Sequence, residues 1–304
     1  MANSMANTMG QNGFNIDPLM KIGYVSLNVS DIQRSLEFYQ SVLGFRILGK
    51  PSNDKALLTN DGNSSHLVEL LRGGTGKTSS QITKRAGLYH FAILLPERKY
   101  LADILLSLRE KRNKVHFDGL ADHLVSEAIY IRDPDFNGIE IYRDRPVSEW
   151  NCNGSQIEMA TLRLDTDNLL KEATKGGWKN MPLGTKIGHV HLRVRNLVKA
   201  MKFYHEILGL NLTTTYPGAY FFAADNYHHH IAANTWLGRG IEPASPDRLG
   251  LNHFAIKLSN EQEYEKVVKR FAQYKVDDQD NGSQGSSSVF VRDYDGITIR
   301  LFHT

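Results

Sequence analysis

The sequence lacks several features that would place it in common classes of protein. It contains a single cysteine, Cys152, which excludes an intrachain disulfide framework and is typical of proteins from a reducing cytoplasm. It has no apolar run near the ~18 residues that a membrane-spanning helix needs, and its net charge of +3 is not gathered into a basic run. We therefore expect a cytoplasmic protein whose partner is a small molecule rather than a nucleic acid or a membrane.

The start of the chain also lacks the pattern of a targeting segment. Residues 1–20 are rich in Asn, Met and Gly, without a basic start followed by an apolar run. We expect a flexible N-terminal tail there. The chain as a whole has 304 residues, of which 41% are hydrophobic and 23% charged, a composition typical of soluble globular proteins long enough for two domains.

Internal repeats divide the chain into two similar halves. Residues 22–48 (IGYVSLNVSDIQRSLEFYQSVLGFRIL) align without a gap with residues 187–213 (IGHVHLRVRNLVKAMKFYHEILGLNLT), with 9 of 27 positions identical. A second pair, GLYHFAILL and GLNHFAIKL, matches at 7 of 9 positions. These repeats predict one domain over residues 21–145 and another over residues 186–304, joined by a linker over residues 146–185.

Each half contains two units with the same predicted order of elements. The first unit opens with alternating apolar residues at Val25, Leu27 and Val29, which is the periodicity of a strand. A helix with an apolar face follows, capped at its start by Ser30 or Asp31. Further short strands complete each unit, so the sequence predicts four units of one strand, one helix and three strands.

The helix ends FYQSVLGF and FYHEILGL, together with a histidine near the start of most units, resemble the glyoxalase, bleomycin-resistance and extradiol-dioxygenase superfamily, also called vicinal oxygen chelate proteins. Several segments, such as GLYHFAILLPERK and YHHHIAANTW, are similar to two-domain bacterial catechol 2,3-dioxygenases. The resemblance implies an α+β fold of four βαβββ modules, arranged as two domains with curved mixed sheets. Because this fold hosts several chemistries, the resemblance indicates the family more strongly than the reaction.

The resemblance also implies a divalent metal, held by one histidine from the first strand of each of two units and one glutamate from a last strand. The first-strand positions of the four units hold Tyr24, His90, His189 and His253. Glu140 is the last-strand carboxylate of unit two, and we match it with Thr298 in unit four, whose neutral hydroxyl is a poor metal ligand. Only units two and three then supply a complete set, so we predict that His90, Glu140 and His189 bind the metal, within one chain or across a dimer of a homo-oligomer.

Three further residues are predicted to act on the substrate by the same resemblance. Tyr130 lies ten residues before Glu140, and His123 matches a histidine that hydrogen-bonds a bound catecholate. In the run His228-His229-His230, we assign the acid–base role to His230, with His228 as the second choice. Strand alternation would place these two on one face and His229 on the other.

With Fe(II) bound, the resemblance implies extradiol cleavage of a catechol-type aromatic by O2. With Mn(II), Zn(II) or Ni(II) and a fourth protein ligand, the same site would suit a glyoxalase-like isomerase or a thiol transferase. The third alternative is a non-enzymatic protein that binds an aromatic molecule in the cavity formed by the curved sheets. Metal analysis of the isolated protein would separate the first two.

Overall fold

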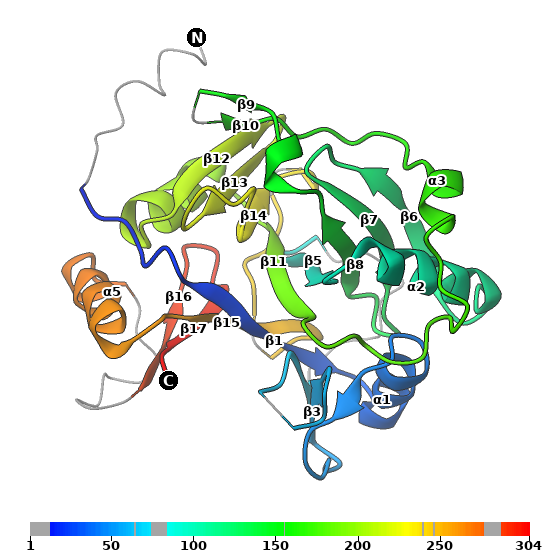
Figure 1. Ribbon diagram of the computed structural model, residues 1–304. Coiled ribbons are helices and arrows are strands. Elements are labelled where there is room, and N and C mark those ends of the chain that lie inside the picture. Colours follow the sequence, from blue (N-terminus) through cyan, green and yellow to red (C-terminus); the bar gives the residue numbers. More distant parts are fainter. Residues whose placement is uncertain are drawn as a thin grey trace.

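The computed structural model describes residues 13–63, 65–73, 84–154, 156–238, 240–245, 247–276 and 287–304 (Figure 1). Unit one contains β1 (Lys21–Val29), α1 (Ile32–Ser41), β2 (Arg46–Ile47), β3 (Lys55–Thr59) and β4 (Val68–Arg72). Unit two contains β5 (Gly87–Leu94), α2 (Arg98–Glu110), β6 (His116–Asp122), β7 (Ser126–Arg132) and β8 (Gly138–Asp144). Both units have the predicted order of one strand, one helix and three strands.

In the second half of the chain, unit three repeats this order, and unit four has two strands after its helix among the described residues. Unit three contains β11 (Lys186–Arg193), α4 (Leu197–Ala200), the π-helical segment η3 (Met201–Ile207), β12 (Asn211–Tyr216), β13 (Ala219–Ala223) and β14 (Ile231–Asn234). Unit four contains β15 (Gly250–Lys257), α5 (Glu261–Gln273), β16 (Ser288–Arg292) and β17 (Thr298–Phe302). Between the halves lie η2 (Val147–Glu149), β9 (Cys152–Asn153), β10 (Gln156–Ile157) and α3 (Thr166–Leu170).

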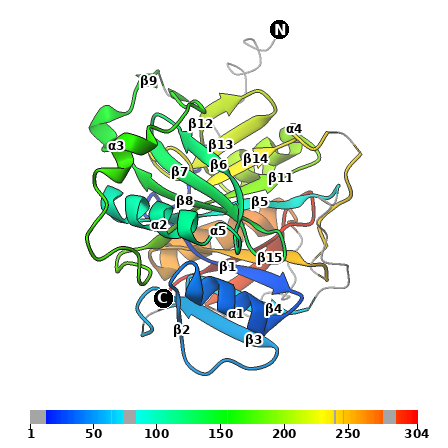
Figure 2. The same ribbon diagram turned by 90° about the vertical axis from the view of Figure 1, so that its right-hand side faces the viewer.

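The four units form two large mixed sheets, which confirms the predicted α+β class. One sheet has eight strands in the order β12-β13-β14-β11-β5-β8-β7-β6, and the other has seven in the order β16-β17-β15-β1-β4-β3-β2. The first sheet therefore joins units two and three, and the second joins units one and four. Figure 2 shows the eight-stranded sheet above the seven-stranded one. The predicted linker over residues 146–185 divides the sequence into two halves. The sheets do not follow this division, because each half contributes one unit to each sheet.

A pair of central strands holds each sheet together. In the eight-stranded sheet, β5 and β11 run antiparallel, and His189 lies opposite Ala92. Ala92 in turn lies opposite Glu140 on the neighbouring strand β8. Val190 and Leu192 point to the other face and are fully buried in the hydrophobic core, as expected for alternation along a strand. The sheet thus carries the row of His189, Ala92 and Glu140 on one face and the apolar side chains of the core on the other.

Position 188 requires glycine because the side chain of Tyr142 lies against the backbone there. A Cβ at this position would overlap the hydroxyl of Tyr142, which is fully buried and bonded to the Tyr227 hydroxyl at 2.8 Å. We expect Gly188→Ala to destabilise the fold by about 3 kcal/mol or more, because a rigid buried ring must move. Urea denaturation will measure this loss. In a Tyr142→Phe background the cost should be smaller, since the nearest overlapping atom is gone; an equal cost in both backgrounds would contradict the explanation.

Helix α1 begins where the sequence predicts. The Asp31 side chain accepts a hydrogen bond from the backbone of Arg34 and caps α1. Gly44, just after the helix, has a φ of +79°, a conformation that favours glycine. Tyr39 at the end of α1 donates from its hydroxyl to Asp133 of unit two at 3.1 Å. This contact joins the two units of the first half, although they belong to different sheets.

The N-terminal segment is only partly as predicted. Residues 1–12 of the expected tail lie outside the described residues. The rest of that segment packs onto the folded units, since Ile16 and Met20 are buried and Asp17 accepts a hydrogen bond from the backbone of Ser259 at 2.7 Å. Burial of these two apolar side chains stabilises the packed position of this part of the segment, against the prediction of a flexible tail up to residue 20.

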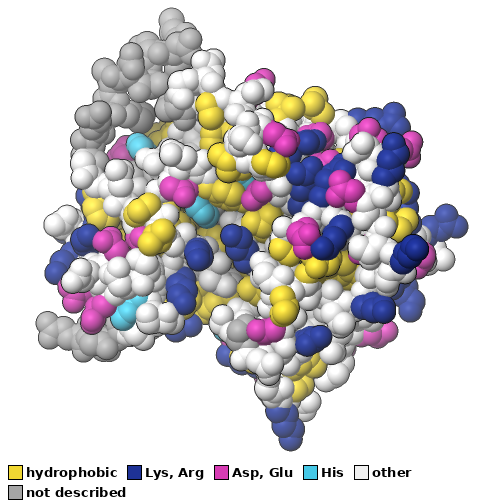
Figure 3. Space-filling view, in the orientation of Figure 1, with side chains coloured by type: hydrophobic (Ala, Val, Ile, Leu, Met, Phe, Trp, Pro, Cys, Tyr) yellow, Lys and Arg dark blue, Asp and Glu magenta, His cyan; other side chains and the backbone are white. Residues whose placement is uncertain are grey.

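In the part of the chain that the structure describes, no helix is long and apolar enough to cross a membrane. The face seen in Figure 3 carries acidic and basic side chains close together, with apolar side chains scattered among them.

Candidate metal centre

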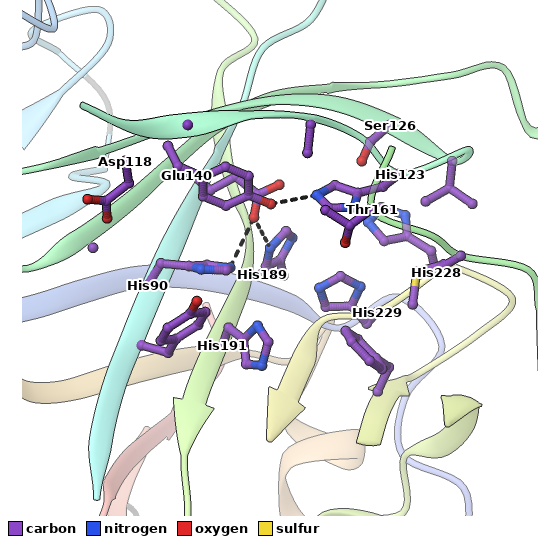
Figure 4. A pocket seen from close by; sticks show the side chains of 18 of the residues that line it. His90, Asp118, His123, Ser126, Glu140, Thr161, His189, His191, His228 and His229 are labelled. Atoms are coloured by element: carbon purple, nitrogen blue, oxygen red, sulfur yellow. Dashed lines mark hydrogen bonds and ion pairs between the residues drawn. The ribbon is translucent and has the colours of Figure 1, made fainter. Parts of the chain in front are cut away.

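The structure brings together the three predicted metal ligands, all from one chain (Figure 4). The Oε2 atom of Glu140 lies 3.0 Å from Nε2 of His90 and 3.1 Å from Nε2 of His189. All three side chains are at least nine-tenths buried. Ala92 lies between Glu140 and His189 in the row across the sheet, and its small methyl group leaves room above the row.

These distances suit a divalent ion. Two ligand atoms that are each about 2.1 Å from one ion and at right angles to each other are about 3.0 Å apart. In addition, Nε2 of His90 has no hydrogen-bond partner among the described residues despite its short distance to Glu140. A buried nitrogen this close to a carboxylate oxygen, with no other partner among the described residues, is placed as a ligand atom would be. Two histidines and one carboxylate also leave coordination positions open.

The electrostatics of the three side chains agree with a cation site. Burial alone would raise the pKa of Glu140. The contacts of its carboxylate with the imidazoles of His189 and His90 outweigh burial and hold that pKa well below its usual range. Burial lowers the pKa of His90, although Glu140 acts in the opposite direction. A charged carboxylate beside a neutral imidazole is the protonation state that binds a metal ion, and a buried anion is costly without a cation nearby.

His123 and Tyr130 lie together beside the centre. Nδ1 of His123 is 2.7 Å from the backbone carbonyl of Ala160, to which it donates, because a carbonyl can only accept. In a neutral ring Nε2 is then the acceptor, so the Tyr130 hydroxyl donates to it at 2.7 Å. Burial raises the pKa of Tyr130 well above its ordinary value, and Glu140 adds to this. The pair is therefore fixed in orientation by the linker residue Ala160.

The histidine run after β13 differs from the prediction. His228 to His230 lie in an irregular bend before β14 rather than in a strand, so strand alternation does not apply to them. His228 and His229 line the pocket, whereas His230 does not. Its Nδ1 instead accepts a hydrogen bond from the backbone of Ala224 at 3.3 Å, and burial lowers its pKa to about 4. The structure thus places His229, rather than His230, beside the predicted ligand His189.

His229 is the member of the run that faces the centre most closely. Its ring centroid is 4.1 Å from that of His189, and the other side of the ring packs on Phe221 at 5.0 Å. The ligand atoms of His189, His228 and His229 also lie within 4.8 Å of one another. His228 is set further back, with its Nδ1 3.7 Å from Oδ1 of Asp144.

A pocket of about 360 Å³ surrounds these groups, a volume suited to a small aromatic molecule. One part of its wall comes from the segment between units two and three, namely Met159, Ala160 and Thr161. Nothing in the sequence repeat marks these residues, since the linker has no counterpart elsewhere in the chain. The sequence prediction also missed His191, although it lies two residues after His189 and hence on the same face of β11.

The seven-stranded sheet repeats the row with different side chains. Tyr24 lies opposite Ala255, and Ala255 lies opposite Arg300. Arg300, and not Thr298, is therefore the counterpart of Glu140. The sequence match was misled by glycine: Gly296 has a φ of +80° and occupies the turn position of Phe136, whose φ is +64°. Thr298 is instead the counterpart of Gly138, two residues before the ligand position.

This second row is satisfied without a metal ion. Arg300 donates to the Tyr24 hydroxyl at 3.0 Å, and that hydroxyl donates to Nε2 of His253 at 3.0 Å. Glu69, the unit-one residue that the sequence prediction did not consider, lies opposite Ser26 on β1 and pairs with Lys55 at 2.5 Å. Two cations and one carboxylate would repel a divalent ion rather than hold one.

Because its Nε2 atom already accepts a hydrogen bond from the Tyr24 hydroxyl, His253 should not hold a metal. We expect His253→Ala to retain the same metal content as the unchanged protein, whereas His90→Ala should lose it. Elemental analysis after gel filtration in a weak chelator will measure both variants. The two histidines occupy matching positions, so each is the control for the other, and loss of metal in the His253 variant alone would reverse the assignment of the centre.

The chain matches known proteins over most of its length. The model of the Glyoxalase/Bleomycin resistance protein/Dioxygenase superfamily matches residues 21–141 and 186–301. A relative named catechol-2,3-dioxygenase, from Bacillus subtilis (strain 168), is 39% identical over 266 residues, which are 86% of this chain and 91% of the relative. Glyoxalase I from Zea mays has a similar fold, with a TM-score of 0.53, 16% identity, and coverage of 93% of this chain and 92% of the maize protein. The solved structure of a protein from Bacillus subtilis subsp. subtilis str. 168 also has a similar fold, with a TM-score of 0.62 and 13% identity. The match covers 95% of this chain and 86% of the Bacillus chain.

Proposed function

The chain belongs to the Glyoxalase/Bleomycin resistance protein/Dioxygenase superfamily, and from this premise we propose that it is an Fe(II)-dependent extradiol dioxygenase acting on a catechol-type aromatic. The observation that carries the proposal is the buried set of His90, Glu140 and His189 in a pocket of about 360 Å³. The relative's printed name supports the catechol class of substrate. Support for metal dependence comes from the family and from the ligand set together.

In this proposal His90, Glu140 and His189 hold the iron. Bound Fe(II) supplies a Lewis acid that lowers the proton affinity of the catechol oxygens, and open positions for the substrate and O2. The protein supplies a shaped cavity in which the ligand atoms are already arranged. Since the three side chains come from neighbouring strands of one sheet, little reorganisation is needed when the ion binds.

His123 and Tyr130 act on the substrate by position. Their mutual hydrogen bond of 2.7 Å fixes the Tyr130 hydroxyl next to Glu140. The Ala160 carbonyl fixes the imidazole of His123 in turn. A substrate oxygen held between these groups would be oriented without loss of further side-chain freedom, which is the source of rate enhancement by positioning.

His229 takes the acid–base role that the sequence assigned to His230. Its ring lies against His189 and lines the pocket, and its Nδ1 has no hydrogen-bond partner among the described residues. An imidazole in this place can receive the catechol proton and return it to an oxygen atom later in the cycle. His230 is not among the residues that line the pocket.

Ring cleavage can be tested directly. Full-length protein loaded anaerobically with Fe(II) should consume one O2 per catechol when air is admitted, and the ring-opened semialdehyde product should turn the solution yellow. An oxygen electrode and a spectrophotometer give the two readings. No oxygen uptake with several catechols, together with Zn(II) or Ni(II) in the protein as isolated, would favour the isomerase alternative, in which His229 would serve as a fourth ligand.

A further inference from the structure

Strand β11 carries a row of polar side chains that leads away from the metal centre. His189, His191 and Arg193 alternate with Val190 and Leu192, which are fully buried in the core. The three polar residues therefore share the face that carries the pocket. Because every second residue advances by about 6.6 Å, Arg193 lies about 13 Å along the strand from the ligand His189.

His191 makes the first step of this row and is fixed by neighbours. The backbone N–H of Trp236 binds the side-chain oxygen of Asn234 at 3.2 Å, so the Asn234 amide nitrogen donates to Nε2 of His191 at 3.0 Å. The His191 ring also packs against Tyr89 with centroids 5.0 Å apart. This wall of the pocket is thus rigid, and it leads from the centre to Arg193.

Arg193 is not one of the residues that line the pocket, but it lies against residues that do. Its guanidinium is 5.7 Å from the ring centroid of Tyr89, and Tyr89 lines the pocket. Arg132, which also lines the pocket, is near enough to repel it. His191, two residues earlier on the same face, lines the pocket as well. Three neighbours on three strands therefore place the guanidinium beside the cavity.

The charge of Arg193 is not balanced by the protein. Among the described residues, no carboxylate forms an ion pair with it and no oxygen accepts a hydrogen bond from it. Burial, followed by the repulsion from Arg132, lowers its pKa to about 10, so the group stays charged at neutral pH but in an unfavourable place. A partly buried cation that lies near a tyrosine ring and a second cation, with no acceptor among the described residues, has its donors free for an anion.

On the basis of the proposed ring-cleaving function, we propose that the substrate is a catechol that carries a carboxylate substituent, and that Arg193 binds this carboxylate at the edge of the pocket. The two catechol oxygens would lie at the metal centre and the substituent would extend along β11. A planar guanidinium beside a carboxylate can make two parallel hydrogen bonds, which adds directional specificity.

The other charged groups of this wall do not cancel the preference. Asp118 is the acidic side chain that lines the pocket on this side, and Arg132 binds both of its oxygens, at 3.1 and 2.7 Å. His116 also lies 3.2 Å from Asp118. With Asp118 neutralised by Arg132, the charge that remains for a ligand is that of Arg193.

Paired substrates will test the proposal. We would measure kcat/KM of the Fe(II)-loaded protein for 3,4-dihydroxybenzoate, 3,4-dihydroxyphenylacetate and 3-(3,4-dihydroxyphenyl)propionate, and for the methyl ester of each acid. At least one acid should be preferred over its own ester by about 10- to 100-fold, the range of a charge-assisted hydrogen bond. Arg193→Met should abolish this preference through KM, and Arg193→Lys should keep part of it. Arg46→Met, an exposed arginine in the other sheet, should leave the preference unchanged.

The outcomes separate this inference from the function on which it rests. Equal kcat/KM for every acid and its ester, or an equal loss for both in the Arg193→Met variant, would overturn the role of Arg193 while ring cleavage stands. If neither the acids, their esters nor 4-methylcatechol is cleaved, the proposed function fails. Anaerobic titration of the same acids, followed by protein fluorescence, still reports on Arg193 in that case: tighter binding to the unchanged protein than to Arg193→Met supports the site, and equal binding refutes it.

Discussion

Replacing Glu140 with glutamine should remove the metal and abolish ring cleavage. The substitution keeps the size of the side chain but takes away the anionic ligand whose Oε2 contacts both His90 and His189. Substitutions one shell further from a metal already cost about 10- to 100-fold in affinity or activity, so we expect a loss of more than about 100-fold in both. Metal content by elemental analysis and the initial rate of O2 uptake will measure the two losses.

The seven-stranded sheet provides a matched control for this variant. Glu69 pairs with Ser26 on β1 as Glu140 pairs with Ala92 on β5, and it is also buried. Glu69→Gln should therefore disturb the ion pair with Lys55 but leave the metal content intact. If the Glu69 variant loses the metal and the Glu140 variant keeps it, the centre lies in the other sheet.

The apo form of the Glu140 variant should remain folded. In the metal-free protein the glutamine can still hydrogen-bond to His189, so the change removes a charge and creates no cavity. Thermal unfolding in a chelator should then differ little between the variant and the unchanged protein, while added metal ion should raise the melting temperature of the unchanged protein only. This comparison separates loss of the ligand from loss of the fold.

The sequence was sufficient to predict the units, and to predict that His90, Glu140 and His189 lie close together, because both depend on repeated positions. His90 and His189 occupy the same place in two copies of one strand, and a repeated place in the fold needs no knowledge of distant contacts. The alternation of apolar residues then fixes which face of each strand is buried. The repeats alone do not predict the order of the strands in the sheets. Only the residue types at the possible ligand positions indicate that units two and three share one sheet.

The errors arose where local backbone geometry overrides the pattern of residue types. Phe136 adopts the left-handed conformation that Gly296 adopts in the other copy, so aligning glycine with glycine shifted unit four by two residues and concealed Arg300. Alternation predicts a strand through the run at His228, but the chain bends there before β14 begins. Alternation gives the wrong face as soon as a bend replaces the extended backbone.

Replacing His229 with phenylalanine should lower kcat by about 100- to 10,000-fold, the contribution typical of a positioned acid–base group. The metal should be retained, because His90, Glu140 and His189 remain. Phenylalanine keeps the packing on Phe221 and against His189 but can neither accept nor donate a proton. Single-turnover measurements with catechol, combined with metal analysis, will show whether chemistry is lost while the ion stays bound.

The two neighbouring histidines decide how this result is read. His230→Phe should keep most of the activity, since that ring is outside the pocket lining and bonds to the backbone of Ala224. His228→Phe tests whether the ring beside Asp144 shares the role of His229, as its place in the pocket lining allows. A large loss of kcat in the His230 variant with full activity in the His229 variant would restore the assignment made from strand alternation. That outcome would require the bend before β14 to straighten when metal and substrate bind, because only an extended backbone turns His230 toward the centre.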